Sequence, residues 1–309
     1  MEQTANQSSS TSTFGQANTI LCATSRRHAW SGVGALSIKT FRGGRAHYTT
    51  GHGYHAVDDE VYLVLNQGQP YSIAVDSDAP VESFCVFFAD GLAAQVRHSL
   101  SGSDARLLDA PEPPAAAIEF FDRTYAHDHV LSPALARMRE LARRPYEQSW
   151  LDEQFHDLMT RLLHIHQRAL CEVAHLPAAR PATRAELYRR LHLARDYIDA
   201  TYAGPLRLAD LARTAGLSPN HLLRTFRQLF QLTPYQYITG RRLELARRLL
   251  AETELPISEI CLAVGFESLG SFSWLFRRKV GVAPSEYRRL HQRSREPRTE
   301  NCLTMNAER

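Results

Sequence analysis

Residues 206–238 read LRLADLARTAGLSPNHLLRTFRQLFQLTPYQYI, and residues 255–289 read LPISEICLAVGFESLGSFSWLFRRKVGVAPSEYRR. The two stretches share one pattern, about fifty residues apart. The matching pairs are Leu211 and Ile260, Gly216 and Gly265, Leu217 and Phe266, Phe226 and Phe276, and Pro234 and Pro284. The second copy has one extra residue between its glycine and its phenylalanine. A duplication this extensive predicts two structural units of the same kind.

Each copy predicts two helices joined by a tight turn. In the first copy, apolar residues at helical spacing indicate a buried stripe formed by Leu208, Leu211, Ala212 and Ala215. Gly216 follows, because a helix often ends in left-handed backbone that glycine adopts without steric cost. Ser218 and Pro219 then supply an N-cap and a first-turn residue for a second helix. In the second copy, Gly265 and Ser268 repeat the turn and the cap.

The second helix of each copy has an apolar inner face and a largely polar outer face. A helix-turn-helix places this second helix in the major groove of DNA, which is wide enough to admit it. We therefore predict the outer residues as DNA-binding residues. They are Asn220, His221, Leu223, Arg224 and Arg227 in the first copy, and Leu269, Gly270, Ser271, Ser273, Trp274 and Arg277 in the second.

One helix is predicted to join the copies. Thr233 and Pro234 provide a cap and a first helical residue, and apolar residues at helical spacing continue to about Glu252. Nineteen residues at about 1.5 Å each give a rod of roughly 28 Å. Successive major-groove faces lie about 34 Å apart on one side of a duplex. Our hypothesis is that one chain inserts both second helices into adjacent grooves.

These motifs resemble those of the AraC family of bacterial transcription regulators, across roughly residues 185–290. The residues that carry the resemblance are Ala212, Gly216, Ser218, Leu222, Arg224 and Phe226, then Arg242, Ala246, Leu249 and Leu250, then Ile257, Glu259, Ile260, Gly265, Phe266 and Ser268, and finally Phe276, Gly281, Pro284, Tyr287 and Arg288. The resemblance implies a DNA-binding regulator, more often an activator that contacts RNA polymerase, and no enzyme. Trp274 departs from the pattern, because the family usually has a polar residue at this place.

The charge distribution independently favours binding to a polyanion. Residues 180–295 contain twenty Lys and Arg against ten Asp and Glu, a net charge of +10. Residues 1–179 contain fourteen against twenty, a net charge of −6, so the mild +3 of the whole chain conceals a basic C-terminal third. Such a surplus is the electrostatic signature of phosphate binding, and a solvated Arg-rich face is the alternative.

The remaining composition indicates the cellular compartment of the protein. No apolar run approaches the roughly 18 residues of a membrane span, and the N-terminus lacks a secretory signal. Five cysteines without paired or metal-ligand spacing indicate reduced thiols in a cytoplasm. Residues 1–13 and 292–309 have the composition of disordered tails. We expect a cytoplasmic protein of two domains without membrane contact.

The first half of the chain predicts an all-β barrel over residues 14–108. The runs ALSIKTF, EVYLVLNQ, YSIAVD and VESFCVFFA are short, β-branched or aromatic, and separated by turn residues. The segment HGYHAVDDEVYLVLNQG resembles a worn first motif of the cupins, with His55, Glu60 and Gly68 in order. The expected fold is therefore α+β and multidomain: a cupin-like barrel with helices, then an all-α tandem helix-turn-helix domain over residues 185–291.

The barrel offers two kinds of candidate site. His47, His52, His55 and Glu60 form the only plausible cluster of metal ligands, but Gly53 breaks the expected His-x-His pair. We therefore expect no metal, no cofactor and no catalytic residue. The alternative is a cavity for a small effector, and a barrel filled by its own side chains is as plausible as the cavity. The predicted effector-binding residues are His47, His55, Glu60, Tyr62, Tyr71 and Phe84, with Val64 and Ile73 also facing the cavity.

Two helices are predicted within residues 109–175, after the Pro-rich connector Asp109–Ala117. One carries Leu131, Leu135, Met138 and Leu141, and a longer one runs from Ser149 to Val173. Each apolar stripe must be buried, either against the barrel or in a homodimer interface. LPAARPATR, residues 176–184, is predicted as an extended interdomain linker.

Three functions compete at this point. The first is a sequence-specific DNA-binding regulator that responds to a small effector. The second is a DNA binder whose first domain only dimerises or contacts a protein partner. The third is a cupin enzyme with a DNA-binding tail, against which the broken His-x-His pair argues.

Overall fold

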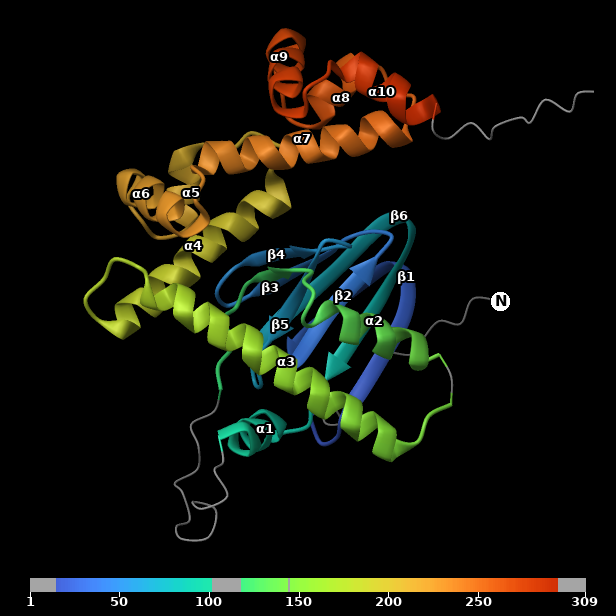
Figure 1. Ribbon diagram of the computed structural model, residues 1–309, viewed down its shortest axis with the longest axis vertical. Coiled ribbons are helices and arrows are strands. Elements are labelled where there is room, and N and C mark those ends of the chain that lie inside the picture. The colour runs from blue at the N-terminus through green and yellow to red at the C-terminus, as the bar shows by residue number, and fades with distance from the viewer. Residues whose placement is uncertain (1–14, 102–117, 144, 294–309) are drawn as a thin grey trace, which may run out of the picture. The chain divides into compact units, whose positions relative to one another are not determined.

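A computed structural model describes residues 15–101, 118–143 and 145–293 (Figure 1). These residues form two compact units. The first unit comprises the described part of Met1–Ala200 together with Leu208–Thr233. The second unit comprises Thr201–Arg207 and the described residues from Pro234 onward. The connector Asp109–Ala117 and nearly all of both predicted tails lie outside the described residues.

The first unit contains an antiparallel β-barrel. Its strands are β1 (Thr19–Val33), β2 (Ser37–Arg42), β3 (Ala46–Thr50), β4 (Tyr54–Val57), β5 (Val61–Leu65), β6 (Pro70–Phe87) and β7 (Thr124–Ala126). The strand order is β4-β3-β6-β2-β5-β7, with β1 on the other edge of β6. Strand β4 contacts β5 and β7, so the sheet curls into a nearly closed barrel (Figure 1). The predicted barrel is confirmed, although β7 comes from the segment 109–175 that was predicted as helical.

Strand β6 joins two runs that the sequence separates at Pro80. Its pairing with β1 is interrupted there, between Asp76 and Val81, where the register shifts. A proline cannot donate a ladder hydrogen bond, and such an irregularity accommodates it. Strand β1 was mostly missed, because its residues are largely exposed and carry no alternating apolar pattern.

The two faces of the sheet belong to different cores. Residues of one face pack on helices α1 (Leu92–Ser101), α2 (Ser132–Leu141) and α3 (Gln148–Ala174). This outer core contains Ile38, Tyr62, Val64, Phe84 and Val86 from the sheet, and Leu131, Leu135, Met138, Phe155, Leu158 and Leu162 from the helical segment. The inner face contributes Phe41, Tyr48, Val57, Leu63, Leu65, Val75 and Val81 to a second core. The apolar stripes of α2 and α3 are therefore buried against the barrel within one chain.

Helix α4 (Pro181–Thr201) begins inside the predicted linker. The expectation of an extended segment over residues 176–184 is wrong from Pro181 onward. Pro181 begins the helix, because its fixed φ and missing N–H suit the first turn.

The first helix-turn-helix consists of α5 (Leu208–Thr214) and α6 (Pro219–Phe230). Gly216 has a φ of 60°, the left-handed conformation predicted for the turn. The Ser218 hydroxyl accepts a hydrogen bond from the backbone N–H of His221, as expected of an N-cap. Leu222 and Phe226 are fully buried. The predicted motif is confirmed in each of these details.

The second unit contains the other copy. Its helices are α7 (Pro234–Glu252), α8 (Ile257–Ala263), α9 (Leu269–Val280) and α10 (Pro284–Arg293). Gly265 has a φ of 89°, and the Ser268 hydroxyl accepts from the backbone N–H of Ser271. Arg242 of α7 donates hydrogen bonds to the carbonyl oxygens of Tyr202 and Gly204 at 2.8 Å each. The joining helix thus has the predicted bounds and is held by its own unit.

Cys22, Cys85, Cys171 and Cys261 are free thiols, and Cys302 lies outside the described residues. Among the helices of the described ranges, none combines the length and apolar character that crossing a bilayer requires.

Candidate DNA-binding surfaces and an interdomain network

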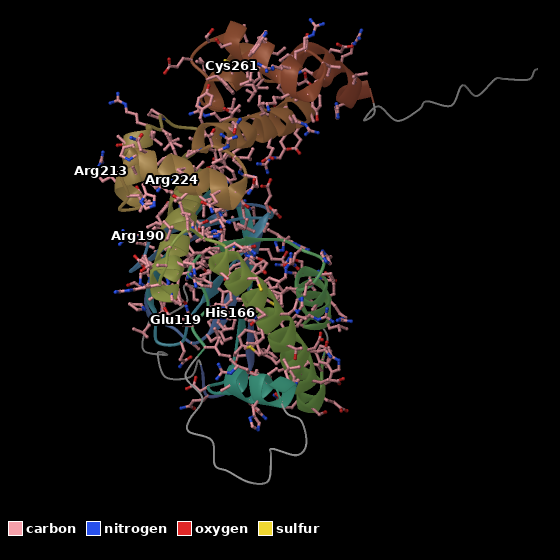
Figure 2. The ribbon with its side chains drawn as sticks, turned by 60° about the vertical axis from the view of Figure 1, so that its left-hand side comes forward. Glu119, His166, Arg190, Arg213, Arg224 and Cys261 are labelled. Carbon is pink, nitrogen blue, oxygen red and sulfur yellow. The ribbon has the colours of Figure 1, made fainter. Side chains whose placement is uncertain are left out.

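The outer face of α6 is polar and accessible. Asn220, Arg224 and Arg227 are exposed, whereas His221 and Leu223 are partly buried. Figure 2 labels Arg224 on this helix-turn-helix, together with Arg213 of α5. Arg224 lies opposite the buried Phe226 stripe, so its guanidinium is available to a base or a phosphate.

The outer face of α9 has a different chemistry. Leu269, Gly270, Ser271, Trp274 and Arg277 are exposed, and Ser273 is half-buried. Trp274 is 61% exposed, the highest fraction for a large apolar side chain on this helix. When the copies are aligned on Phe226 and Phe276, Trp274 occupies the position of Arg224. All predicted DNA-binding residues thus lie on the two predicted helices, with three of them only partly accessible.

Helix α4 is held by the first helix-turn-helix. The Arg190 guanidinium donates to the carbonyl oxygen of Gly216 at 3.0 Å, and to Glu186 of its own helix at 2.7 Å. The His192 ring meets Phe230 of α6 edge-on, with 5.1 Å between ring centroids. The turn and the second helix of the motif therefore both contact α4.

The same helix is held by the barrel through buried charges. His55 Nδ1 of β4 lies 2.8 Å from Asp196 Oδ2 of α4, and His55 Nε2 lies 3.2 Å from Asp122 Oδ1. Asp196 also accepts hydrogen bonds from the backbone N–H and the hydroxyl of Thr124 in β7. Arg195 donates to Asp196 and to the Thr124 carbonyl. We call His55, Asp122, Thr124, Arg195 and Asp196 the α4 network.

The charges of the α4 network shift its proton affinities. Burial alone would lower the pKa of His55, but the hydrogen-bonded carboxylates of Asp122 and Asp196 outweigh it and raise the pKa to about 9. Burial would raise the pKa of Asp196, but the Arg195 guanidinium and the His55 ring hold it below its usual value. The network therefore consists of an imidazolium and an arginine between two carboxylates near neutral pH.

The raised pKa of His55 predicts a pH-dependent stability. Protonated His55 stabilises the folded state by about 3 kcal/mol, the free energy that corresponds to the rise of its pKa from about 6.5 in the unfolded chain to about 9. This stabilisation is complete below pH 6.5 and is lost as the pH rises through about 9. We expect the free energy of unfolding of the wild type to fall over this range relative to His55→Asn. Lys39, whose pKa burial lowers to about 8, acts in the opposite direction in both proteins, so the difference isolates His55. Parallel curves for the two proteins would contradict a charged His55.

The structure does not bring the predicted effector-binding residues together. Tyr62 and Phe84, with Val64, face the helices, while Tyr71 and Ile73 lie against the inner core. The ring of His47 stacks on Tyr54, 5.4 Å between centroids. His55 belongs to the α4 network. Glu60 is half-buried and lies between β4 and β5. The sequence predicted most of the strands but did not determine which face of each strand lies inside the barrel.

His52 and His55 of the cupin-like segment both lie close to the Asp122 carboxylate. Gly53, at the place of the missing histidine, lies against α4, where an added Cβ would be 2.1 Å from Leu193 Cδ1. His52 lies 3.3 Å from the carboxylate of Asp122. Within the described residues, no three His, Cys, Asp or Glu are arranged to hold a metal ion.

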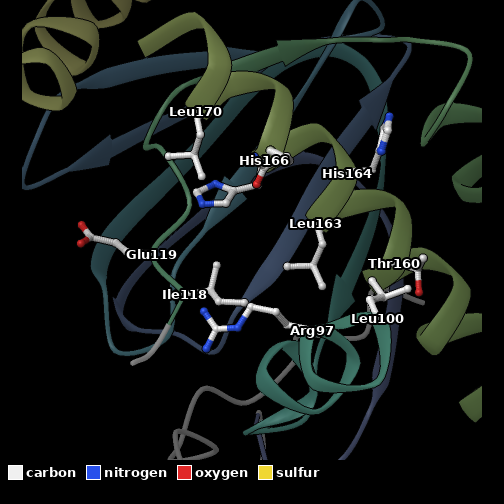
Figure 3. A pocket seen from close by; sticks show the side chains of 10 residues that line it. Arg97, Leu100, Ile118, Glu119, Thr160, Leu163, His164, His166 and Leu170 are labelled. Atoms are coloured by element: carbon white, nitrogen blue, oxygen red, sulfur yellow. The ribbon is translucent and has the colours of Figure 1, made fainter. Parts of the chain in front are cut away.

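Two of the cavities among the described residues of the first unit bear on the site. One of about 590 Å³ lies between α1 and α3, where Arg97, Leu163 and His166 point into it (Figure 3). The other, of about 420 Å³, is bounded by the β3–β4 loop with the adjoining strand ends, residues 49–54, and by Leu193, Tyr197 and Thr214 from α4 and α5. This second cavity, which we call the junction cavity, touches both the barrel and the helices of the DNA-binding part. His52 joins its wall to Asp122 of the α4 network.

Sequence reasoning missed Asp122, Arg195 and Asp196. The available signal was Asp196, a charged residue that follows Tyr188 and His192 at spacings of eight and four on one face of the helix. A carboxylate among buried residues requires a partner, because an isolated buried charge is costly. The partner itself comes from a strand 141 positions away and has no local pattern.

Each copy of the duplicated motif exposes the outer face of its second helix. This arrangement is that of a helix-turn-helix DNA-binding protein. A family model described as a helix-turn-helix domain matches residues 211–290. Regulatory protein SoxS of Salmonella typhimurium is 39% identical over 93 residues, which cover 30% of this chain and 87% of SoxS. The melibiose operon regulatory protein of Escherichia coli is 36% identical over 100 residues, covering 32% of this chain and 33% of that protein. The chain spans about a third of the length of this and several other curated relatives.

A solved structure of a Chromobacterium violaceum regulator with an AraC-type DNA-binding domain is 34% identical. It covers 35% of this chain and 95% of that chain, with a TM-score of 0.32. The family assignment rests on the match to SoxS, because it covers 87% of that protein at 39% identity. This protein belongs to the AraC family of DNA-binding transcription regulators.

Proposed function

We propose that this protein is a sequence-specific activator that binds double-stranded DNA through α6 and α9 and responds to a small-molecule effector. The observation that carries the effector response is the position of α4. This helix contacts the barrel through the α4 network and the first helix-turn-helix through Arg190 and His192. A change in the barrel that alters α4 therefore acts directly on a DNA-binding motif.

The junction cavity is the proposed effector site. An effector can shift an equilibrium only by its differential affinity for two states of the protein. A ligand in the junction cavity would touch the β3–β4 loop and α4 and α5 at once. Its affinity would therefore depend on the arrangement of the loop relative to α4 and α5. The affinity of a ligand enclosed by barrel strands alone would depend on that arrangement less directly.

A ligand panel tests this proposal on the full-length protein. Ligands are first scored by thermal shift, and each that binds is then added to an operator titration. We expect an effector to change operator affinity by about 5–150-fold, the usual range of such coupling. Thr214→Phe, which places a bulky side chain at the cavity wall, should abolish the change and leave unliganded operator binding intact. If ligands bind but none changes operator affinity, the first domain serves assembly only.

Arg224 is proposed as a base-reading residue. Arg224→Ala should weaken operator binding by about 1–3 kcal/mol and relax preference at one base position, because arginine donates two hydrogen bonds to guanine. Arg213→Ala is the matched control, since it removes another exposed arginine, one that lies on α5. Equal losses on all DNA sequences would make Arg224 a phosphate contact, and no loss would contradict the docking of α6.

We also propose a homodimer and a contact with RNA polymerase, on the family resemblance. A feature of the first unit supports dimerisation: β1 pairs only with β6 among the described strands, so its other edge is open over fifteen residues. Exposed edges are templates for pairing with a second chain. Sedimentation of the full-length protein should reveal a dimer, and a monomer at all concentrations used for DNA binding would contradict this part of the proposal.

A further inference from the structure

Trp274 stands at the centre of the outward face of α9. At 100° per residue, Phe272 and Phe276 lie almost opposite Trp274 around the helix, and both are fully buried in the core of the second unit. The Trp274 ring is 61% exposed. Since Phe272 and Phe276 fix the rotation of the helix, the tryptophan points away from the protein. Among the described residues of its unit, Arg278 contacts the face of this large apolar side chain.

The surface around Trp274 is open to a close approach. Gly270 lies one turn earlier on the same face. A Cβ added to Gly270 would meet only Ser268 Oγ within 4 Å, at 3.8 Å, so no neighbouring side chain covers the backbone there. A duplex can therefore come close to the helix beside the indole ring.

Positive charge lies beside the ring. The Arg278 guanidinium lies 5.1 Å from the centroid of the Trp274 ring, a cation–π contact. Arg277 is exposed and lies three residues after Trp274 on the same side of the helix. These cations can contact phosphates, which position a protein on DNA without reading its sequence. Because Arg278 contacts the ring before DNA arrives, the tryptophan loses less side-chain freedom on binding.

The two copies thus present opposite chemistry at one equivalent position. Arg224 of α6 has donors for the acceptors of guanine, whereas the indole of Trp274 has one N–H and is otherwise apolar. The thymine C5-methyl is the apolar group that bases present in the major groove. We infer that Trp274 reads thymine methyl groups, so that the second helix-turn-helix prefers a T-containing site. This inference rests on the proposed sequence-specific binding of DNA.

Deoxyuridine scanning tests the inference, because it removes only the methyl group of a thymine. An operator selected from random duplexes is remade with each thymine replaced singly by deoxyuridine. Full-length wild type should lose about fourfold in affinity at one or two positions, the effect of one buried carbon. Trp274→Ala should bind the thymine and deoxyuridine forms of these positions equally. Trp274→Leu, which retains an apolar side chain, should keep part of the difference.

Arg224→Ala is the matched control on the other copy. It should weaken binding yet leave the same deoxyuridine positions sensitive. If wild type enriches no sequence, the proposed function itself fails. If it enriches an operator but tolerates every deoxyuridine, or if Trp274→Ala stays as sensitive as wild type, methyl reading by Trp274 is overturned.

Discussion

Asp196→Asn is expected to lower the free energy of unfolding of the first unit by about 3–5 kcal/mol. Removing one partner of a buried ion pair leaves the other charge without compensation. Asp196 is fully buried and accepts hydrogen bonds from His55, Thr124 and Arg195. The asparagine keeps the size of the side chain but not its charge. Urea denaturation of the full-length protein near pH 7 measures the loss.

Glu186→Gln is the control for this variant. Glu186 lies on the same helix and pairs with Arg190, but its side chain is 50% exposed. Exposed pairs contribute about 0–1 kcal/mol, so the control should resemble the wild type. If Asp196→Asn also stays within that range, the α4 network does not fasten the helix to the barrel, and transmission through it is contradicted.

Phe276→Ala is expected to destabilise the second unit by about 3–5 kcal/mol, the usual effect of truncating a fully buried phenylalanine. Its ring lies 5.7 Å from that of Phe272 and 5.5 Å from that of Tyr287. Loss of these contacts should unfold α8–α10 at lower temperature while the first unit melts as before. Operator affinity should fall because α9 is no longer presented.

Leu262→Ala is the matched control in the same unit, because that leucine is 65% exposed. Its melting curve and operator affinity should equal those of the wild type. Far-UV circular dichroism and calorimetry separate the two transitions. If Phe276→Ala unfolds in a single thermal transition that is shifted to lower temperature, the division into two units is contradicted.

The helix-turn-helix copies could be predicted from sequence because their determinants are local. Gly216 and Gly265 require left-handed backbone, Ser218 and Ser268 cap the next helix, and neighbouring apolar residues form the inner stripe. Each of these features acts over a few residues. The structure confirms the turns, the caps and the bounds of α7.

The first domain was predicted less completely because its determinants are distant in sequence. The strands were visible, but the face of each strand depends on what covers it. Tyr62 and Phe84 face helices that come later in the chain, so their assignment to an inner cavity did not hold in the structure. His55 was singled out as a possible ligand residue, yet its partners Asp122 and Asp196 follow no motif. Only the fold brings such groups together.

Selection of binding sites from random duplexes by the full-length protein tests the central claim most directly. We expect two blocks of base preference, one containing guanine and one containing thymine. Arg224→Ala should blur the first block alone, and Trp274→Ala should blur the second block alone. A wild-type protein that enriches no sequence, or blocks that neither substitution changes, would contradict DNA reading by α6 and α9.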